Sequence, residues 1–298
     1  MSLRDVNSRQ LGLICRHSIA NALRSGSGLV YLMLALFFGL IAANAVISPF
    51  EILVSQRGGM SPAMVEQSLV TVARPVIEWA IGQDEVDVQT VAWVDFLLRD
   101  RPALMSAIFF VLVIGTPLLI PFGAFNQTSG DIGNRGLRYL LLRTERANIY
   151  YGRLIATMLF SIAVQFVVIA IVALYLWLKV GIYDGLEILG WSLQGLFALS
   201  ILSLPYVAVC AWLSACTDSP MTSLVMSTAV IGGVLLGAVI AQSRFDGGGW
   251  LAWLLPWGVQ QHLFRPELHI VALTAIACLL YMAFFAWLGA RKFGSRDL

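Results

Sequence analysis

The segment from Asn126 to Arg153 concentrates the side chains in this sequence that are best suited to ionic chemistry. It lies between two long apolar runs. Arginine carries a permanent charge and a fork of N–H donors that matches a carboxylate. The predicted chemistry is therefore docking onto an acidic partner. The basic residues of the segment are Arg135, Arg138, Arg143, Arg146 and Arg153, against only Asp131 and Glu145.

Side chains that could catalyse a reaction are not clustered in the sequence. The sequence contains no GxxxxGK[ST] phosphate loop, no HExxH and no CxxC, and His17, His262 and His269 lie in three separate regions. Serines in the apolar runs, such as Ser223 and Ser227, have no histidine in any run to activate them. We expect a chain that is not an enzyme and that binds no metal, cofactor or nucleic acid.

The middle of the segment has the pattern of a short amphipathic helix. Leu137, Leu140 and Leu141 recur at helical spacing, and arginines occupy the other side between Gly136 and Arg143. Such a helix, exposed to water, is typical of one that inserts into a groove of a partner protein.

The composition of the whole chain predicts the kind of protein in which this segment lies. The 298 residues are 59% hydrophobic and 12% charged, whereas soluble proteins carry about 25% charged residues. Six apolar stretches are long enough to cross a hydrocarbon core of about 30 Å. We therefore predict an all-α membrane protein with six transmembrane helices in a single domain over residues 1–298. The stretches are Gly28 to Phe50, Ala103 to Phe125, Leu154 to Leu178, Ile188 to Cys216, Pro220 to Ala241 and Ile270 to Ala290.

Charge predicts the orientation. If both termini are cytoplasmic, the inner segments hold most of the 19 Lys and Arg residues, and the outer segments hold most of the 17 Asp and Glu residues. This distribution follows the positive-inside rule, so residues 126–153 form a cytoplasmic loop. The spans carry no Asp, Glu, Lys or Arg between their polar ends. Carriers driven by protons or sodium use such groups or unwound polar sites near the midplane, so the energy for any transport must come from outside the spans.

Three further segments complete the layout. Residues 1–27 form an arm with a basic amphipathic helix that we expect to lie on the inner leaflet. Residues 51–102 form an acidic extracytoplasmic loop with two helices, the second from Val88 to Leu98. Residues 245–268 are too short and too rich in Trp, Gly and Pro to span, and predict a re-entrant segment between the fifth and sixth spans.

The segment from Asn126 to Arg153, called the connector below, also resembles a known family. The order Asp131, then Gly136 to Leu141, then Arg143, Arg146 and Gly152-Arg153, is similar to the loop after the second span of ABC-2 type ABC transporter permeases. The layout of arm, six spans and outer re-entrant segment is similar as well. The sequence departs from the family pattern at four places: Gly133 for a usual glutamate, Arg135-Gly136 for Gly-Thr, Thr144 for a proline and Arg153 for a lysine.

The resemblance implies a permease subunit in a bacterial-type inner membrane, working as a homodimer with two copies of a separate ABC ATPase that binds ATP and Mg. The connector would carry the coupling helix that docks on this ATPase. The residues expected to couple the two subunits are Asp131, Arg135, Leu137, Arg138, Leu140, Leu141, Arg143 and Arg146.

Two other functions fit the sequence. In the first, the ATP-driven movement is delivered to an extracytoplasmic partner protein docked on residues 51–102, as in the branch of this family tied to copper-enzyme maturation. Alternatively, the chain is a membrane scaffold that transports nothing and has no ATPase. Copurification of a nucleotide-binding protein distinguishes the scaffold from both other functions.

Overall fold

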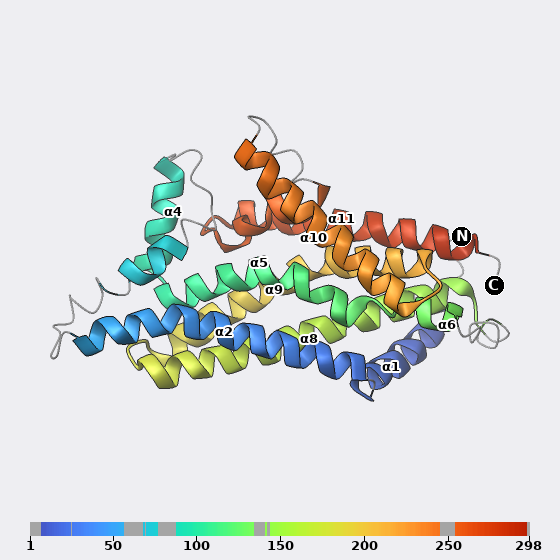
Figure 1. Ribbon diagram of the computed structural model, residues 1–298, viewed down its shortest axis with the longest axis horizontal. Helices are drawn as coiled ribbons and strands as arrows, with labels where there is room; N and C mark the ends of the chain where they lie inside the picture. Colours follow the sequence, from blue (N-terminus) through green and yellow to red (C-terminus); the bar gives the residue numbers. More distant parts are fainter. Residues whose placement is uncertain are drawn as a thin grey trace.

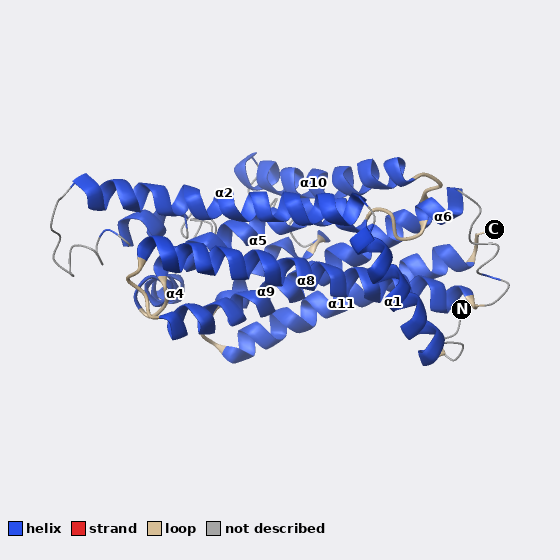
Figure 2. Cartoon of the chain, turned by 90° about the horizontal axis from the view of Figure 1, so that it is seen from below, coloured by secondary structure: helices blue, strands red, loops and turns tan. Residues whose placement is uncertain are grey.

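The computed structural model describes residues 7–24, 26–56, 68, 70–76, 88–133, 141, 144–244 and 254–296. Every regular element in these ranges is helical (Figure 2). Six helices are long and apolar enough to cross a membrane, which confirms the predicted all-α architecture. They run along the length of the molecule or obliquely to it (Figure 1). These helices are α2 (Gly26–Gln56), α5 (Ala103–Ala124), α8 (Arg146–Val180), α9 (Gly185–Cys216), α10 (Pro220–Arg244) and α11 (Leu268–Gly294).

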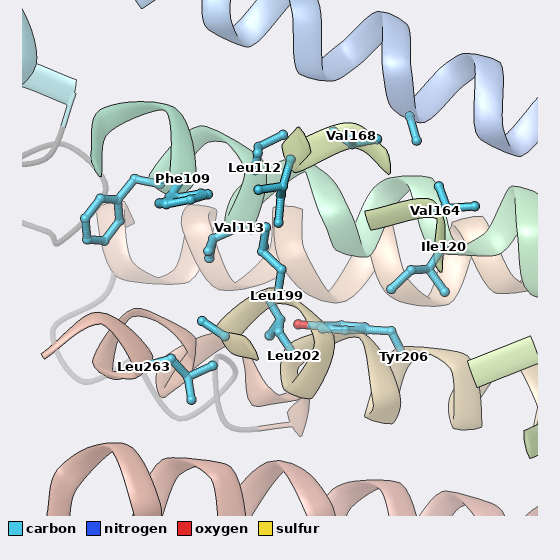
Figure 3. Close-up of a cluster of buried hydrophobic side chains, with 14 of the residues drawn as sticks. Phe109, Leu112, Val113, Ile120, Val164, Val168, Leu199, Leu202, Tyr206 and Leu263 are labelled. Carbon is cyan, nitrogen blue, oxygen red and sulfur yellow. The ribbon is translucent and has the colours of Figure 1, made fainter. Parts of the chain in front are cut away.

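Helix α5 forms the centre of the bundle. The share of its span buried inside the protein is 78%, against 17% for α11 and 28% for α10. Figure 3 shows Leu112 and Val113 of α5 pointing towards Leu199 and Leu202 of α9. Because lipid is as apolar as these side chains, close packing rather than the hydrophobic effect holds such helices together.

Glycines permit the closest of these contacts. A Cβ added at Gly195 of α9 would lie 2.2 Å from the ring of Phe109 on α5, and one at Gly115 would lie 2.1 Å from the ring of Phe38 on α2. The aromatic rings therefore occupy the space that a larger residue would need.

The end of the bundle opposite the connector is covered by helix α4 (Val88–Arg99), which stands across the long helices (Figure 1). Its bounds confirm the predicted second helix of the 51–102 segment. Trp93 and Leu97 of α4 are buried, and the Trp93 indole N–H donates to the carbonyl of Phe264 at 3.1 Å. The buried Ser106 hydroxyl of α5 donates to the Leu97 carbonyl at 3.3 Å. The cap is thus part of the folded core.

The segment between α10 and α11 is described from residue 254 onwards. It forms two 3-10 helices, η3 (Pro256–Gly258) and η4 (Gln260–Phe264), and buries Leu263 and Phe264 in the core. Trp250 and Trp253, on which the re-entrant prediction also depends, lie outside the described residues. Re-entry into the bilayer stays a prediction.

At the opposite end lies helix α1 (Ser8–Arg24), which packs against α8 and turns sharply into α2. A Cβ at Gly28 would lie 2.0 Å from the carbonyl oxygen of Ala22, so the turn needs a glycine there. The helix predicted in the arm is confirmed, whereas its place on a membrane surface stays a prediction. The short helix α6 (Ser129–Gly133) lies at the same end of the molecule (Figure 1).

Candidate functional site

The connector between α5 and α8 is shorter than the sequence predicts. Helix α8 begins at Arg146, eight residues before the predicted span, because Ile149 and Tyr150 are buried and continue the apolar face. Its 35 residues span roughly 50 Å at 1.5 Å each, so α8 extends beyond a bilayer core. Arg146 and Arg153 therefore stand on a rigid helix instead of a loop.

Three of the eight predicted coupling residues are described. Asp131 lies in α6, Leu141 is helical, half-buried and packed against the core, and Arg146 is the first residue of α8. The other five lie outside the described residues, as does most of the helix predicted from Gly136 to Arg143. These are Arg135, Leu137, Arg138, Leu140 and Arg143.

The entry to the connector is held by a serine of α9. The hydroxyl oxygen of Ser214, which is fully buried, accepts hydrogen bonds from the backbone N–H groups of Thr128 at 3.0 Å and Ser129 at 3.1 Å. These groups precede or begin α6, and N–H groups there have no partner within the helix. At the end of α5 the roles are reversed. The Ser223 hydroxyl of α10 donates to the Phe125 carbonyl at 2.7 Å.

Arg153 joins the two ends of the connector. From the second turn of α8, its guanidinium donates to the Gln127 carbonyl at 2.7 Å and forms an ion pair with the Asp131 carboxylate. The Arg153 side chain is 16% exposed and that of Asp131 is 40% exposed, so the guanidinium is shielded from water whereas the carboxylate is partly open to it. Residues 127 and 131 are therefore tied directly to α8.

Arg146 and Arg296 form a second set of links. Arg146 donates to the carbonyls of Gly294 at 3.0 Å and Arg296 at 2.7 Å, both at the end of α11. Arg296 donates to the carbonyls of Thr217 at 3.0 Å and Cys216 at 3.2 Å, where α9 ends. Hydrogen bonds thus link the start of α8 to the end of α11, and the end of α11 to the turn between α9 and α10.

Gly133 completes the contact between the connector and that turn. A Cβ at this position would lie 2.4 Å from the carbonyl oxygen of Asp218. A larger residue at position 133 would therefore not fit without displacing α6 from the α9–α10 turn.

Helix α1 is tied to the start of α8. The Asn148 side chain accepts from the Asn7 backbone N–H at 3.0 Å and donates to the Gln10 side chain at 2.9 Å. A Cβ at Gly152 would lie 2.9 Å from a methyl group of Ile14, so the two helices are in close contact.

Sequence reasoning missed Ser214 and Arg296 altogether. Ser214 resembles any other serine of an apolar span, and Arg296 resembles a charge that faces the membrane surface. Arg153 belongs to the sequence pattern that resembles the ABC-2 loop, but it is not one of the eight residues expected to couple the two subunits. The four residues Asp131, Arg146, Arg153 and Arg296, with Ser214, are called the anchoring network below.

The described part of the chain shows no group of three His, Cys, Asp or Glu side chains able to hold a metal ion. A comparison with known protein families finds no match for the chain, and a search of curated proteins finds no relative.

Proposed function

We propose that the chain is the transmembrane permease subunit of an ABC-2 type ABC transporter, working as a homodimer with two copies of a separate ATPase. Its place would be a bacterial-type inner membrane, with both termini and the connector in the cytoplasm. The observation that carries the proposal is the pair of contacts through which Arg153 joins both ends of the connector.

The anchoring network supports a role for the connector as the site where force enters. Ser214 and Ser223 attach its entry to α9 and α10, and Arg153 attaches the same residues to α8. Arg146 extends the links to α11. A connector that served only to join α5 and α8 would not need contacts with three further helices, α9, α10 and α11.

The proposed mechanism follows from these links. ATP, bound with Mg in the partner subunit, would drive closure of the two ATPase subunits. The helix that the sequence predicts from Gly136 to Arg143 would move with them, with its leucines in a groove of the ATPase and its arginines on acidic residues there. Pro117 and Pro121 each remove a backbone donor within α5, so that helix can bend while α8 moves as a rigid rod. The outcome would be an outward route between the two protomers.

The direct test is gentle purification of the tagged chain from its own membranes. A nucleotide-binding protein at a 2:2 ratio supports the proposal, whereas its absence supports the membrane scaffold. In the purified complex, the double variant Arg138→Glu and Arg143→Glu should separate ATP hydrolysis from transport. The matched control, Arg9→Glu and Arg16→Glu on α1, reverses as much charge elsewhere and should preserve the coupling.

Delivery of force to an outer partner is a second candidate, favoured by the seating of α4. The Leu97 carbonyl accepts from Ser106 of α5, and the Trp93 ring packs against Phe110 of α5 with ring centroids 6.1 Å apart. Helix α4 is thereby attached to the same helix that leads into the connector. Movement of α5 would then reach the outer cap. An outer protein that copurifies with the chain and is lost when residues 60–100 are shortened would select this function over export.

A further inference from the structure

A cleft of about 470 Å³ lies between α1 and the inner corner of the bundle. Its walls are α1, the first turn of α2, the end of α5, the entry of the connector and the first turns of α8. The volume falls within the range of roughly 300–1,000 Å³ found for small-molecule sites. The anchoring network uses Arg153 and Asp131 on one wall but leaves the space itself without a role.

The lining is divided into a polar and an apolar part. His17, Ser18 and Asn21 of α1 lie at positions i, i+1 and i+4, which places them on one side of that helix. Apolar surface comes from Leu13 and Ile14 of α1 and from Phe125 at the end of α5. A site that offers both kinds of surface suits an amphiphile.

Arg153 is the cation of the cleft. A guanidinium has five N–H donors, and Arg153 donates to the Gln127 carbonyl and the Asp131 carboxylate. These two acceptors fix the side chain on the wall and leave donors for a third. A group held in this way binds an anion without first losing side-chain freedom.

The surroundings of the cleft are basic. Helix α1 carries Arg9, Arg16, His17 and Arg24 and no acidic residue. Asp131, the acid in the lining, is already paired with Arg153. Basic segments next to a membrane attract anionic lipid.

The position of the cleft relates it to the membrane. Ser27 and Thr157 of its lining belong to helices that are long and apolar enough to span. In the turns after Ser27, α2 leaves Val30 and Met33 exposed, which provides an apolar path for acyl chains. A soluble anion would gain nothing from this surface.

We propose that this cleft binds the phosphate-bearing headgroup of an anionic glycerophospholipid taken laterally from the membrane. Arg153 donates to the phosphate, His17, Ser18 and Asn21 bind the remaining polar atoms, and the acyl chains leave along α2. The site does not depend on an ATPase partner, so its test is independent of the proposed function.

The experiment uses the purified full-length chain in detergent. After stripping of lipid, dioleoyl phosphatidylglycerol is titrated in and the bound lipid is counted by native mass spectrometry. Dioleoyl phosphatidylcholine and inorganic phosphate serve as separate probes. Both lipids carry the phosphate, but the quaternary ammonium of choline cancels the headgroup charge and offers no hydroxyl group to His17, Ser18 and Asn21. We therefore expect one phosphatidylglycerol per chain with an affinity at least about tenfold above that of phosphatidylcholine.

Two variants locate the site. Ser18→Trp fills the cleft, and the double variant His17→Ala with Asn21→Ala removes polar partners without adding bulk; each should lower the affinity about tenfold. The matched control is Gly12→Trp on the same helix, since no atom lies within 4 Å of a Cβ there. It should bind lipid as the parent chain does.

The proposal is overturned by equal binding of the two lipids, by displacement of phosphatidylglycerol with millimolar inorganic phosphate, or by unchanged binding in both cleft variants. A photo-cross-linker placed at position 21 in cells gives a further check. Its capture of a protein, with no lipid adduct, would assign the cleft to a partner subunit and would also overturn the proposal.

Discussion

Arg296 binds Asp218 at the end of the bundle that carries the connector, with 2.7 Å between the guanidinium nitrogen and the carboxylate oxygen. The two residues are far apart in the chain, one just after α11 and the other in the turn between α9 and α10. The side chain of Asp218 is 77% exposed, so water weakens this ion pair. The hydrogen bonds from Arg296 to the carbonyls of Cys216 and Thr217 are therefore the stronger part of the link.

This difference gives the first prediction. Arg296→Gln removes the charge that stabilises the carbonyl end of α9, whereas Asp218→Asn removes only the exposed pair. Amide hydrogen exchange of residues 217–223 should accelerate several-fold in Arg296→Gln and change little in Asp218→Asn. Equal acceleration in the two variants would show that the exposed pair, and not the helix end, holds the turn.

The second prediction concerns Ser214. Ser214→Ala leaves the N–H groups of Thr128 and Ser129 buried without an acceptor, at a cost of roughly 1–3 kcal/mol per group. The matched control is Ser192→Ala on the same helix, because the buried hydroxyl of Ser192 has no hydrogen-bond partner. Thermal unfolding in nanodiscs should show a lower Tm for Ser214→Ala and an unchanged or higher Tm for Ser192→Ala. Similar Tm values would remove Ser214 from the anchoring network.

The contrast between these two serines also shows what could be predicted from the sequence. The six spans follow from the lengths of apolar runs, because a bilayer imposes the same length on every crossing helix. A serine within a run gives no such signal, since Ser192 and Ser214 have similar apolar neighbours. What separates them is a backbone more than 80 residues away along the chain, at Thr128 and Ser129.

The sequence also misplaces the end of the connector, because the contact that extends α8 is not local. Its charge marked residues 126–153 as a loop, yet Arg146 and Arg153 belong to α8. The helix continues there because Tyr150 packs beside Gly289, where a Cβ would lie 1.9 Å from the tyrosine hydroxyl. This close contact with α11 is a property of the assembled bundle and has no local signature.

The third prediction concerns pH. Burial and the nearby charge of Arg265 lower the pKa of His262 from its ordinary value of 6.5. Between the folded pKa and pH 6.5 the unfolded chain binds more protons at this histidine than the folded chain does, so its contribution to stability is present above pH 6.5 and is lost as the pH falls through the folded pKa. His262→Gln should show a smaller loss of Tm than the parent chain between pH 7.5 and 5.5. A parallel pH dependence in both proteins would contradict the assignment.

The fourth prediction tests the packing of the bundle with two glycines of α9. A methyl group at Gly195 would lie 2.2 Å from the ring of Phe109, a ring that also packs against Trp191 and Phe264 with centroids 6.3 and 5.7 Å away. The ring has no free space to move into, so Gly195→Ala should destabilise the fold by about 1–3 kcal/mol.

Gly190, on the same helix, has no atom within 4 Å of a Cβ. Gly190→Ala should therefore be neutral or stabilise the helix by up to about 1 kcal/mol through its better helix propensity. Unfolding of both variants by sodium dodecyl sulfate in mixed micelles provides the comparison. If Gly195→Ala is as stable as Gly190→Ala, then α5 and α9 are not in contact at this point, and the central place of α5 in the bundle would have to be reconsidered.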